Sequence, residues 1–447
     1  MTSSLAYQLS ELLGPEAVLP TEGYLVDGVV PQAVVRPPDR EGVAQVLRWA
    51  AKDGVSLFLR GGGVLAGLGN VPASVDVVLD LTCLNRVVDY QPADLTITAE
   101  AGITLDNLRR ELAQGEKFVP LEAPLSHRAS VGGILATGFS GPMRHSYGLP
   151  RDWLIGISVI GGDGVETKAG GRVVKNVTGY DLNKLYSGSL GTLGVIVEAS
   201  FKIAPLPDTL AGLVAFFSSM EVAVAAARSL VSQVYAPQGI QVASREVAGR
   251  LGLDMPTGSE AMVVAFLSGR PRAVARRAEE STRLLADSGG IAVDDLDETA
   301  SAGLLGGLTD LAWKDTDCPT LALRVSLPPS NVGRLLESIK EREKGDLAGL
   351  AIVADPGFGM VQLLQWPDSP AGGPEPEAIT ALIDSVRRSS RELDGAVVVE
   401  VCPQDVKSGV DVWAGNVEAN ELEIMRRIKR NLDPAGILNP GRFIGRL

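Results

Sequence analysis

Three consecutive glycines interrupt an apolar run early in the chain. The stretch SLFLRGGGVLAGLGN, residues 56–70, reads as a strand that ends in a loop, and two more glycines follow within six residues. Consecutive glycines reach backbone angles that other residues avoid, and they leave backbone N–H donors uncovered. The sequence therefore predicts either a loop whose backbone contacts a ligand or an ordinary glycine-rich surface turn.

Two familiar glycine motifs do not account for this loop. A P-loop needs a lysine directly after its glycines, and no lysine lies within residues 53–116. Gly61, Gly63 and Ala66 do satisfy the GxGxxA spacing of a Rossmann fold, which also needs a crossover helix directly afterwards. Only eleven residues separate Gly63 from the next expected strand at Val75, and three of them are Gly or Pro. We therefore favour a loop that joins two strands.

Two further segments have the same character. They are ASVGGILATGFSG at residues 129–141 and SGSLGTLGVI at residues 187–196, and each borders an expected strand. Three such loops within about 140 residues suit a long cofactor that lies across one domain, and they are hard to explain as unrelated turns.

The pattern of apolar residues predicts the elements around these loops. Residues 32–37, 39–54 and 55–60 read as a strand, a helix capped by Asp39 and a second, parallel strand. Asp163-Gly164 predicts a hairpin turn. Residues 195–203 alternate, which predicts a strand with one apolar face that ends at Pro205.

The second half of the chain follows a different pattern. From about residue 208 onward, apolar strands alternate with amphipathic helices, and the turns are rich in Gly, Pro and Asp. This predicts an antiparallel or mixed sheet covered by helices on one face.

Composition excludes several classes of protein. The 447 residues include 54 acidic and 41 basic side chains, and the net charge of −13 argues against nucleic acid as a partner. Three scattered cysteines and two histidines cannot build a local iron–sulfur cluster or a histidine-rich metal site. No run approaches the roughly 20 apolar residues of a membrane span, and the N-terminus lacks a signal-peptide pattern. We therefore expect a cytoplasmic protein without a metal site, whose redox chemistry would need an organic cofactor or a partner's cluster.

Specific motifs then resemble a known family. RGGG, SVGGILATGFSGPMRHSYGLPRDWLIGISVI and NVTGYDLNKLYSGSLGTLGVI together resemble the FAD-binding domain of the vanillyl-alcohol oxidase type, also called the PCMH type. The tail LDPAGILNPGRF is similar to the returning segment of the D-lactate and glycolate oxidase branch. Within that branch, GGRVVKNVTGYDLNKL followed by GSLGTLG most resembles the FAD-binding E subunit of glycolate oxidase.

The resemblance implies an α+β fold class. It implies a two-subdomain PCMH-type FAD-binding domain, followed by an α+β sheet domain with helices on one face. The expected segments are an N-terminal helix and lead-in over residues 1–24, the FAD-binding domain over 25–207, a cap or substrate-like domain over 208–425, and a segment over 426–447 that returns to the flavin site.

The resemblance also assigns FAD contacts residue by residue. Backbone N–H groups near the first glycines would hold the pyrophosphate, the second loop would follow the phosphates and ribityl chain, the third would lie near the adenine and ribose, and the tail would approach the flavin edge. In that order the residues are Arg60, Gly61, Gly62, Gly63, Val64 and Leu65; Pro124, Ser130, Val131, Gly132, Gly133, Ile134, Thr137, Gly138 and Gly141; Gly191, Thr192, Gly194, Val195 and Ile196; and Asn439 and Gly441.

Three departures from the family pattern bear on activity. Catalytic relatives read GSEGTLG where this chain has Leu190, and they carry an HxHxGDGN motif that supplies metal ligands and a base near the flavin. This chain has no histidine after His145, so its catalytic residues stay unassigned. Val64 stands where some relatives attach FAD through histidine, so we expect non-covalent FAD.

These features lead to three hypotheses of function. The first is an FAD-dependent oxidoreductase subunit of a glycolate (2-hydroxyacid) oxidase complex, which carries electrons toward an iron–sulfur partner beside a sister FAD subunit that keeps the histidine motif. Any membrane association is then expected to run through partners. The second is a self-sufficient D-2-hydroxyacid (lactate or glycolate) dehydrogenase in which Arg324 or Lys314 binds the substrate carboxylate. The third is a non-catalytic FAD-binding scaffold.

Overall fold

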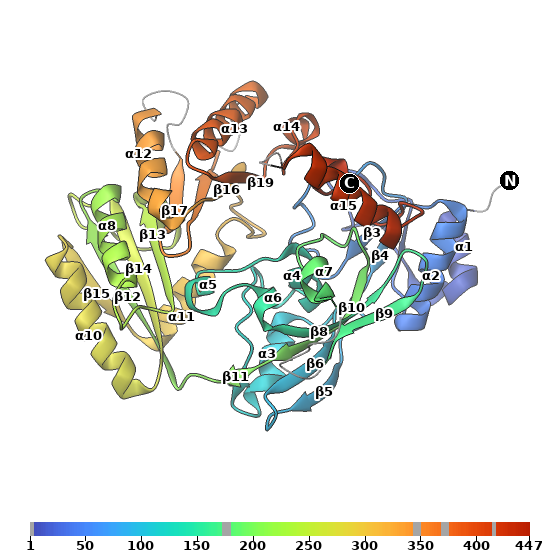
Figure 1. The fold of residues 1–447 in the computed structure, drawn as a ribbon, viewed down its shortest axis with the longest axis horizontal. Helices are drawn as coiled ribbons and strands as arrows, with labels where there is room; N and C mark the ends of the chain where they lie inside the picture. Colours follow the sequence, from blue (N-terminus) through green and yellow to red (C-terminus); the bar gives the residue numbers. More distant parts are fainter. Residues whose placement is uncertain (1–3, 172–179, 343–349, 368–374, 414–416) are drawn as a thin grey trace. The chain divides into compact units, whose positions relative to one another are not determined.

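The computed structural model describes residues 4–171, 180–342, 350–367, 375–413 and 417–447 (Figure 1). Residues 172–179, which hold part of the GGRVVKNVTGYDLNKL motif, lie outside the described residues. The chain divides into two units. The first comprises Met1–Phe139, Leu149–Leu206 and Lys407–Leu447, and the second comprises Ser140–Gly148 and Pro207–Val406. The first unit is therefore built from both ends of the chain.

The first unit combines helices with short strands. Its helices are α1 Leu5–Leu13, α2 Arg40–Asp53, α3 Leu105–Ala113, α4 Val131–Thr137, α6 Pro150–Trp153, α7 Leu182–Tyr186 and α15 Ala419–Leu432, with 3-10 turns at Pro15–Ala17 and Ile444–Arg446. Its strands are β1 Val18–Leu19, β2 Ala33–Val35, β3 Leu57–Arg60, β4 Val77–Asp80, β5 Val87–Gln91, β6 Thr96–Glu100, β7 Lys117–Phe118, β8 Leu154–Ile160, β9 Glu166–Gly170, β10 Val195–Lys202 and β11 Ala204–Pro205.

Two sheets organise this unit. One has the order β1-β2-β4-β3, in which β2 and β3 both run parallel to β4 between them. The other has the order β5-β6-β10-β8-β9 and is antiparallel throughout, while β7 and β11 form a separate pair. Each sheet has its own apolar core. This is the predicted two-subdomain arrangement.

Helix α2 begins, ends and packs as its local sequence predicts. The carboxylate of Asp39 accepts a hydrogen bond from the Gly42 N–H at 2.9 Å, which caps the N-terminus. Gly54 ends the helix with φ of +68°, a left-handed angle that suits glycine. Val43 and Leu47, one helical turn apart, lie in the core against the first sheet.

Strand β10 departs from its predicted alternation. The alternation of residues 195–203 predicts one apolar face, yet Val197 packs in the core of the parallel sheet and Ala199 in the core of the antiparallel sheet. The pairing of β10 with β8 shifts register between Ile196 and Glu198. A bulge of this kind reverses which face the later side chains occupy. The prediction of a single apolar face was therefore wrong, and β10 contributes to both cores.

The second unit is one large antiparallel sheet with helices. Its helices are α5 Arg144–Tyr147, α8 Met220–Val231, α9 Arg245–Arg250, α10 Pro271–Asp287, α11 Glu298–Asp310, α12 Val332–Arg342 and α13 Pro376–Arg391, with a 3-10 turn at Pro329–Asn331. Its strands are β12 Thr209–Phe217, β13 Gly239–Ser244, β14 Ala261–Gly269, β15 Ala292–Leu296, β16 Leu321–Ser326, β17 Ala351–Asp355, β18 Met360–Gln365 and β19 Ala396–Val401. Helix α14, Gln404–Gly409, spans the return to the first unit.

The strands of the second unit follow the order β15-β12-β14-β13-β17-β18-β16-β19. Helices α10, α8, α12 and α13 form a row in which each helix contacts the next. Helices α9 and α11 instead join a core built on alternate residues of the strands. The α+β sheet domain is confirmed, whereas α9 and α11 lie outside the single helical layer that the sequence predicts.

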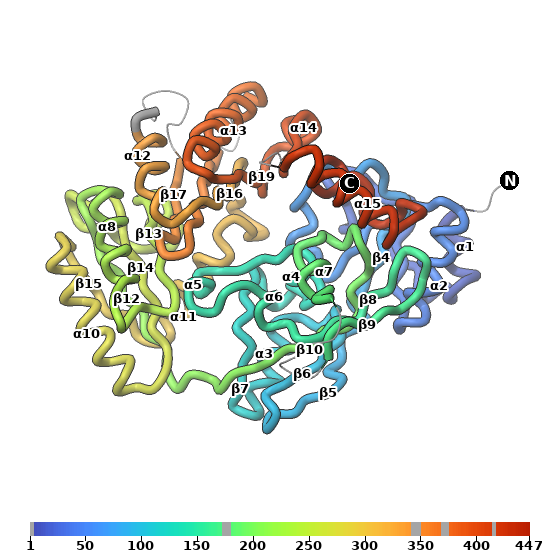
Figure 2. Tube along the Cα trace, in the orientation of Figure 1, coloured from blue at the N-terminus to red at the C-terminus, as the bar shows by residue number. Residues whose placement is uncertain are grey.

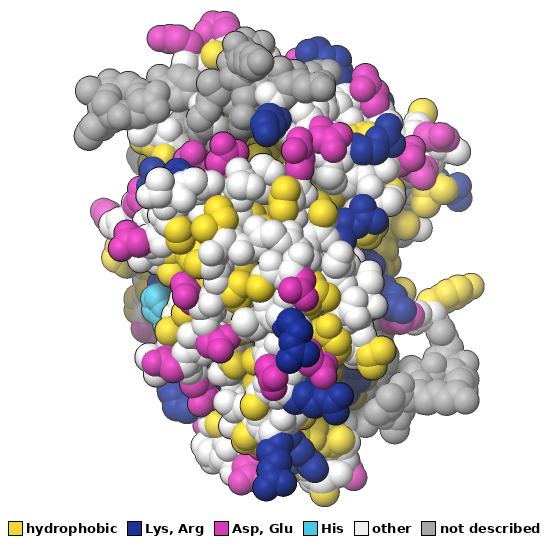
Figure 3. Space-filling model, turned by 90° about the vertical axis from the view of Figure 1, so that its left-hand side faces the viewer, with side chains coloured by type: hydrophobic (Ala, Val, Ile, Leu, Met, Phe, Trp, Pro, Cys, Tyr) yellow, Lys and Arg dark blue, Asp and Glu magenta, His cyan; other side chains and the backbone are white. Residues whose placement is uncertain are grey.

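The charged surface and the length of the helices can be described separately. On the face drawn in Figure 3, basic and acidic side chains are interspersed, and no broad patch of one sign stands out. Within the described ranges, no helix has both the length and the apolar character needed to cross a membrane.

Candidate functional site

The first glycine loop, which follows β3, packs directly on the second loop. A Cβ added to Gly61 would lie 1.9 Å from Oγ of Ser130, and one added to Gly62 would lie 1.7 Å from the carbonyl oxygen of Arg128. No side chain fits at such distances, so glycine is required at both positions. Gly63 has φ of +72°, which also favours glycine. These residues let the two loops touch through their backbones.

The first loop presents uncommitted donors. Over the described part of the chain, the N–H groups of residues 61–65 donate to no backbone or side-chain acceptor. The loop is closed just beyond them by two turns, Ala66 N–H to Gly63 O at 3.3 Å and Leu68 N–H to Leu65 O at 3.0 Å. A run of consecutive backbone donors needs water or an anionic ligand as its acceptor.

The second loop forms helix α4 and its two ends. Ser130 caps the helix, because its Oγ accepts a hydrogen bond from the Gly133 N–H at 3.3 Å. The Thr137 hydroxyl donates to the Gly133 carbonyl at 2.8 Å, which fixes that side chain one turn further along. Gly138 ends the helix in a left-handed conformation, with φ of +65°.

The third loop is tied to the second by its backbone. The Gly188 N–H donates to the Leu135 carbonyl, and the Leu190 N–H donates to the Ala136 carbonyl, both at 2.8 Å. Leu190 has φ of +52° and is almost fully buried. The side chain at the position where catalytic relatives carry an acid is therefore an apolar wall.

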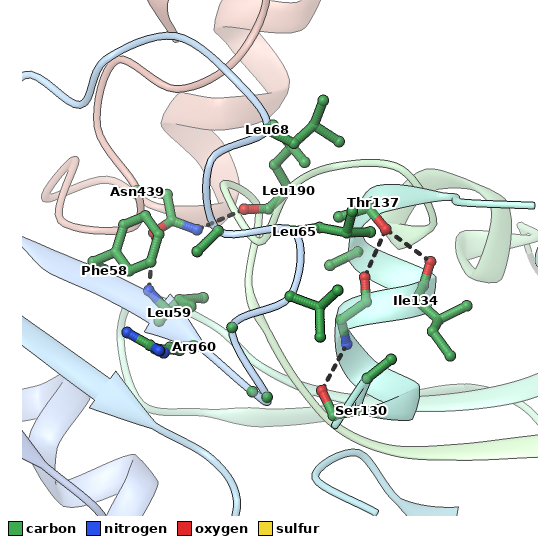
Figure 4. Close-up of a pocket in the computed structure, with 18 of the residues that line it drawn as sticks. Phe58, Leu59, Arg60, Leu65, Leu68, Ser130, Ile134, Thr137, Leu190 and Asn439 are labelled. Atoms are coloured by element: carbon green, nitrogen blue, oxygen red, sulfur yellow. Dashed lines mark hydrogen bonds between the residues drawn. The ribbon is translucent and has the colours of Figure 1, made fainter. Parts of the chain in front are cut away.

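The C-terminal tail returns to the first sheet, where its red trace reaches the blue strands in Figure 2. The Asn439 N–H donates to the Leu57 carbonyl at 2.9 Å, so the tail continues the sheet beside β3. The Asn439 side chain accepts from the Leu59 N–H at 2.9 Å and donates to the Leu190 carbonyl at 2.5 Å (Figure 4). One amide thus joins β3, the third loop and the tail.

These segments line two neighbouring cavities that open to solvent, with about 630 Å³ and 420 Å³ of empty space when the open mouth of each is included. Figure 4 shows the larger one, with α4 on one side and β3 with Asn439 on the other. Eleven of the predicted FAD residues line it: Arg60, Gly61, Gly62, Gly63, Val64, Leu65, Ser130, Gly133, Ile134, Thr137 and Asn439. The smaller cavity adds Gly132, Gly191, Gly194 and Ile196.

Other predicted residues do not line either cavity. These are Pro124, Val131, Gly138, Thr192, Val195 and Gly441 in the first unit, and Gly141 in the second unit. For several of them, packing within the fold explains which amino acid is present. A Cβ on Gly441, for example, would lie 2.9 Å from the Ala73 nitrogen, and Val195 packs in the core of the parallel sheet.

The cavities also have lining residues that are not among the predicted FAD contacts. Most are small or apolar, namely Phe58, Leu59, Ala66, Leu68, Leu81, Ala101, Ala129, Ala136 and Leu190. The remaining one is Arg442, a buried cation two residues after the NP pair of the tail. Apolar lining residues carry no pattern that separates them from core residues, whereas Arg442 lies in the matched tail motif LNPGRF.

Arg60 brings positive charge to both cavities. Its guanidinium lies 4.6 Å from the centre of the Tyr24 ring and donates to the Gly23 carbonyl at 2.8 Å. Burial lowers the pKa of Arg60, and the nearby Arg128 lowers it further. Asp80 is bound to Tyr24, Arg36 and Thr82 at 2.6 to 2.9 Å. A guanidinium that lines both cavities favours an anionic ligand.

The residues considered for substrate binding or catalysis lie outside these two cavities. Arg324 donates from Nε to Glu400 at 2.7 Å, so its charge is already compensated. His127 is exposed, and His145 lies against Gly357 in the second unit. Across the described residues, no group of three or more His, Cys, Asp or Glu side chains is placed to hold a metal ion.

The two cavities together fit an extended nucleotide cofactor. Its free N–H groups and Arg60 would receive the pyrophosphate, and its small and apolar walls leave room for flat rings. The glycines of the first loop are closed against Ser130 and Arg128 on one side, so only the cavity side is open to a ligand.

Family comparisons decide which nucleotide this is. Residues 31–170 match the family described as FAD binding domain, and residues 414–443 match the C-terminal domain of FAD linked oxidases. The chain is an FAD-linked oxidoreductase. Its cofactor is FAD, and both matched segments contribute residues to the larger cavity.

Individual relatives agree with this assignment. The flavoprotein is 24% identical over 466 residues to glycolate oxidase subunit GlcD of Bacillus subtilis, covering 100% of this chain and 98% of the relative. It is 36% identical over 168 residues to glycolate oxidase subunit GlcE of Escherichia coli, covering 37% of this chain and 47% of the relative. The predicted resemblance to this group is confirmed.

Solved structures support the fold. The structure of p-cresol methylhydroxylase with substrate bound superposes with a TM-score of 0.74, covering 98% of this chain and 95% of that one at 17% identity. At this identity the likeness concerns the fold alone, and it confirms the predicted PCMH-type architecture.

Proposed function

We propose that this flavoprotein is the FAD-binding subunit of a complex that oxidises glycolate or a related 2-hydroxyacid. It would work beside a sister flavoprotein that keeps the histidine motif and would pass electrons toward an iron–sulfur subunit. The likeness to two different subunits of glycolate oxidase supports both the substrate class and the multi-subunit setting.

The observation that carries this proposal is the lack of histidine in the whole second half of the chain. His127 and His145 are the two histidines of the sequence, and neither lines the cavities of the FAD site. A flavin enzyme that oxidises an alcohol carbon needs a group that removes the hydroxyl proton. Arg324 is paired with Glu400, so it is a poor candidate for binding a substrate carboxylate.

The residues of the chain would then act mainly on the cofactor. The N–H groups of residues 61–65 would bind the FAD pyrophosphate, and Asn439 would hold β3 and the third loop in register beside it. Ile134 and Leu190 would exclude water from the ring system. FAD itself, when bound, supplies the electron acceptor. Val64 has no atom that could bond to the flavin, so the cofactor would be held non-covalently.

The test is to purify the chain alone and with its genomic neighbours. We expect the isolated chain to carry FAD that is released on denaturation and that stays oxidised when glycolate or D-lactate is added without oxygen. Co-purified sister and iron–sulfur subunits should restore reduction of the flavin by one hydroxyacid. Failure of the assembled complex to reduce its flavin with either hydroxyacid would contradict the proposal.

A second candidate is a self-sufficient hydroxyacid dehydrogenase. The likeness to GlcD, which extends along the whole chain, favours it. Lys314 would remain as the candidate for binding the carboxylate. In the same experiment, rapid bleaching of the flavin in the isolated chain by one hydroxyacid would select this candidate over the first.

A further inference from the structure

A buried charge cluster lies behind the first glycine loop. Arg442, with 3% of its surface exposed, donates from one guanidinium nitrogen to Asp27 at 2.7 Å. Lys407, with 4% exposed, donates to the same carboxylate. Two cations therefore share one carboxylate in the cluster of Asp27, Arg442 and Lys407.

The glycine loop supplies further acceptors to these two cations. The other terminal nitrogen of Arg442 donates to the carbonyls of Ala66, at 2.6 Å, and Leu68, and Lys407 donates to the carbonyl of Gly67 at 2.6 Å. Three successive carbonyls of the loop thus face the cluster. Such charge-assisted bonds are stronger than ordinary backbone hydrogen bonds.

The cluster holds residues 66–68, which directly follow the free N–H groups of residues 61–65. Ala66 and Leu68 donate backward to Gly63 and Leu65, so holding their carbonyls also holds the turns that shape residues 61–65. The Arg442 carbonyl adds a bond from the Asn70 N–H at 2.9 Å, which anchors the far end of the loop. Arg442 itself also lines the larger cavity.

From these contacts we infer that Arg442 and Lys407, balanced by Asp27, are positioning residues for the pyrophosphate of FAD. They hold the loop with its amides free, and they supply positive charge behind it in a site shielded from water. The inference rests on the FAD site and is independent of the substrate. Because the charge acts on phosphate, it should favour FAD over riboflavin, which has no phosphate.

The experiment measures binding of FAD and of riboflavin to apoprotein by flavin fluorescence. The variants are Arg442→Gln, Arg442→Lys and Lys407→Gln. Arg446→Gln is the matched control, since Arg446 lies in the same tail and its guanidinium donates at 3.4 Å to the carbonyls of Ser408 and Val410. Thermal unfolding of each apoprotein shows whether it is folded.

We expect Arg442→Gln to weaken FAD binding about tenfold or more, with riboflavin changed less than about threefold. Arg442→Lys keeps the positive charge but replaces the rigid fork of guanidinium donors with one ammonium group. FAD binding should therefore weaken less in Arg442→Lys than in Arg442→Gln. If Arg442→Gln does not fold, the inference is tested by Lys407→Gln, in which FAD binding should weaken more than riboflavin binding. Equal weakening of both ligands would mean a merely structural role, and unchanged FAD binding in a folded variant would also overturn the inference.

Discussion

At the scale of single residues, the glycines of the first loop separate sharply by what surrounds them. A Cβ on Gly62 would meet the Arg128 carbonyl, whereas Gly67 has nothing within 4 Å of the added atom. We expect Gly62→Ala to push the first two loops apart, to lower stability by about 1–3 kcal/mol and to weaken FAD binding about tenfold or more. Gly67→Ala, in the same loop, should match the wild type. Calorimetry of the apoprotein and an FAD titration check both, and equal behaviour of the two variants would contradict the packing argument.

These glycines were predictable from the sequence, whereas the charges behind them were not. Close approach of two backbones leaves a visible mark, because only glycine fits. A buried cation such as Arg442 looks like any surface arginine, and its partner Asp27 lies 415 residues away. Only the fold brings the two together, so sequence reasoning had no signal for the pair beyond the tail motif.

A second residue-scale feature is the buried carboxyl of Asp355 at the end of β17. Its Oδ1 accepts from the N–H groups of Gly357 and Phe358 at 3.0 and 2.9 Å, while its Oδ2 has no partner among the described residues. Burial raises the pKa of Asp355 from its ordinary value of 3.8, and those N–H groups, with His145 and Arg144, oppose the rise. The folded protein therefore holds this proton more tightly than the unfolded chain does.

The sign of the pH dependence follows directly. The stability that protonated Asp355 contributes is complete below about pH 3.8 and is lost as the pH rises through the folded-state pKa. We expect Asp355→Asn, which keeps the Oδ1 acceptor, to stabilise the protein by about 1–3 kcal/mol at neutral pH and less in acid. Urea unfolding at several pH values measures this. The exposed control Asp287→Asn should show no such change, and a destabilised Asp355→Asn at neutral pH would refute the argument.

At the scale of elements, helix α15 is anchored by a buried lysine. Lys429 donates to Asp433 at 2.6 Å and to the carbonyls of Thr192 and Leu438 at 2.8 Å, so one ammonium joins the helix, the third loop and the tail. Burial lowers the pKa of Lys429, and Asp433 opposes that change. The Asp433 side chain is fully buried, so it depends on this cation.

Removing the lysine should therefore be costly. We expect Lys429→Met to lower the free energy of unfolding by about 3–5 kcal/mol, because Asp433 would remain buried without its partner. Arg430→Gln, next to it on the exposed side of the helix, should change stability by less than about 0.5 kcal/mol. Chemical denaturation of both variants gives the comparison, and a loss below about 1 kcal/mol for Lys429→Met would show that the lysine is not an anchor.

Elements differ in how far their own sequence determines them. Caps such as Asp39 and Gly54 act within a few residues, so helix α2 could be predicted together with its buried face. The bulge in β10 depends on its pairing with β8, a contact that alternation alone does not encode.

At the scale of the whole molecule, the FAD site is completed by the last residues of the chain. The bond from the Leu59 N–H to Asn439 spans 380 residues, and residues 437–442 hold β3 and the first glycine loop together. The loop therefore depends on contacts from a segment that is distant in the chain. We expect the pyrophosphate loop to bind FAD only when the tail is docked.

Truncation tests this dependence. A chain that ends at Gly436 should purify without FAD, and adding FAD should not raise its melting temperature, because a ligand stabilises only the state that binds it. A chain that ends at Phe443 keeps Asn439 and Arg442, and it should retain FAD and its stabilising effect. Bound flavin per chain and melting curves with and without FAD measure both outcomes. If the shorter chain retained FAD in full, the first loop would bind FAD without the tail, and the proposed dependence on the tail would be wrong.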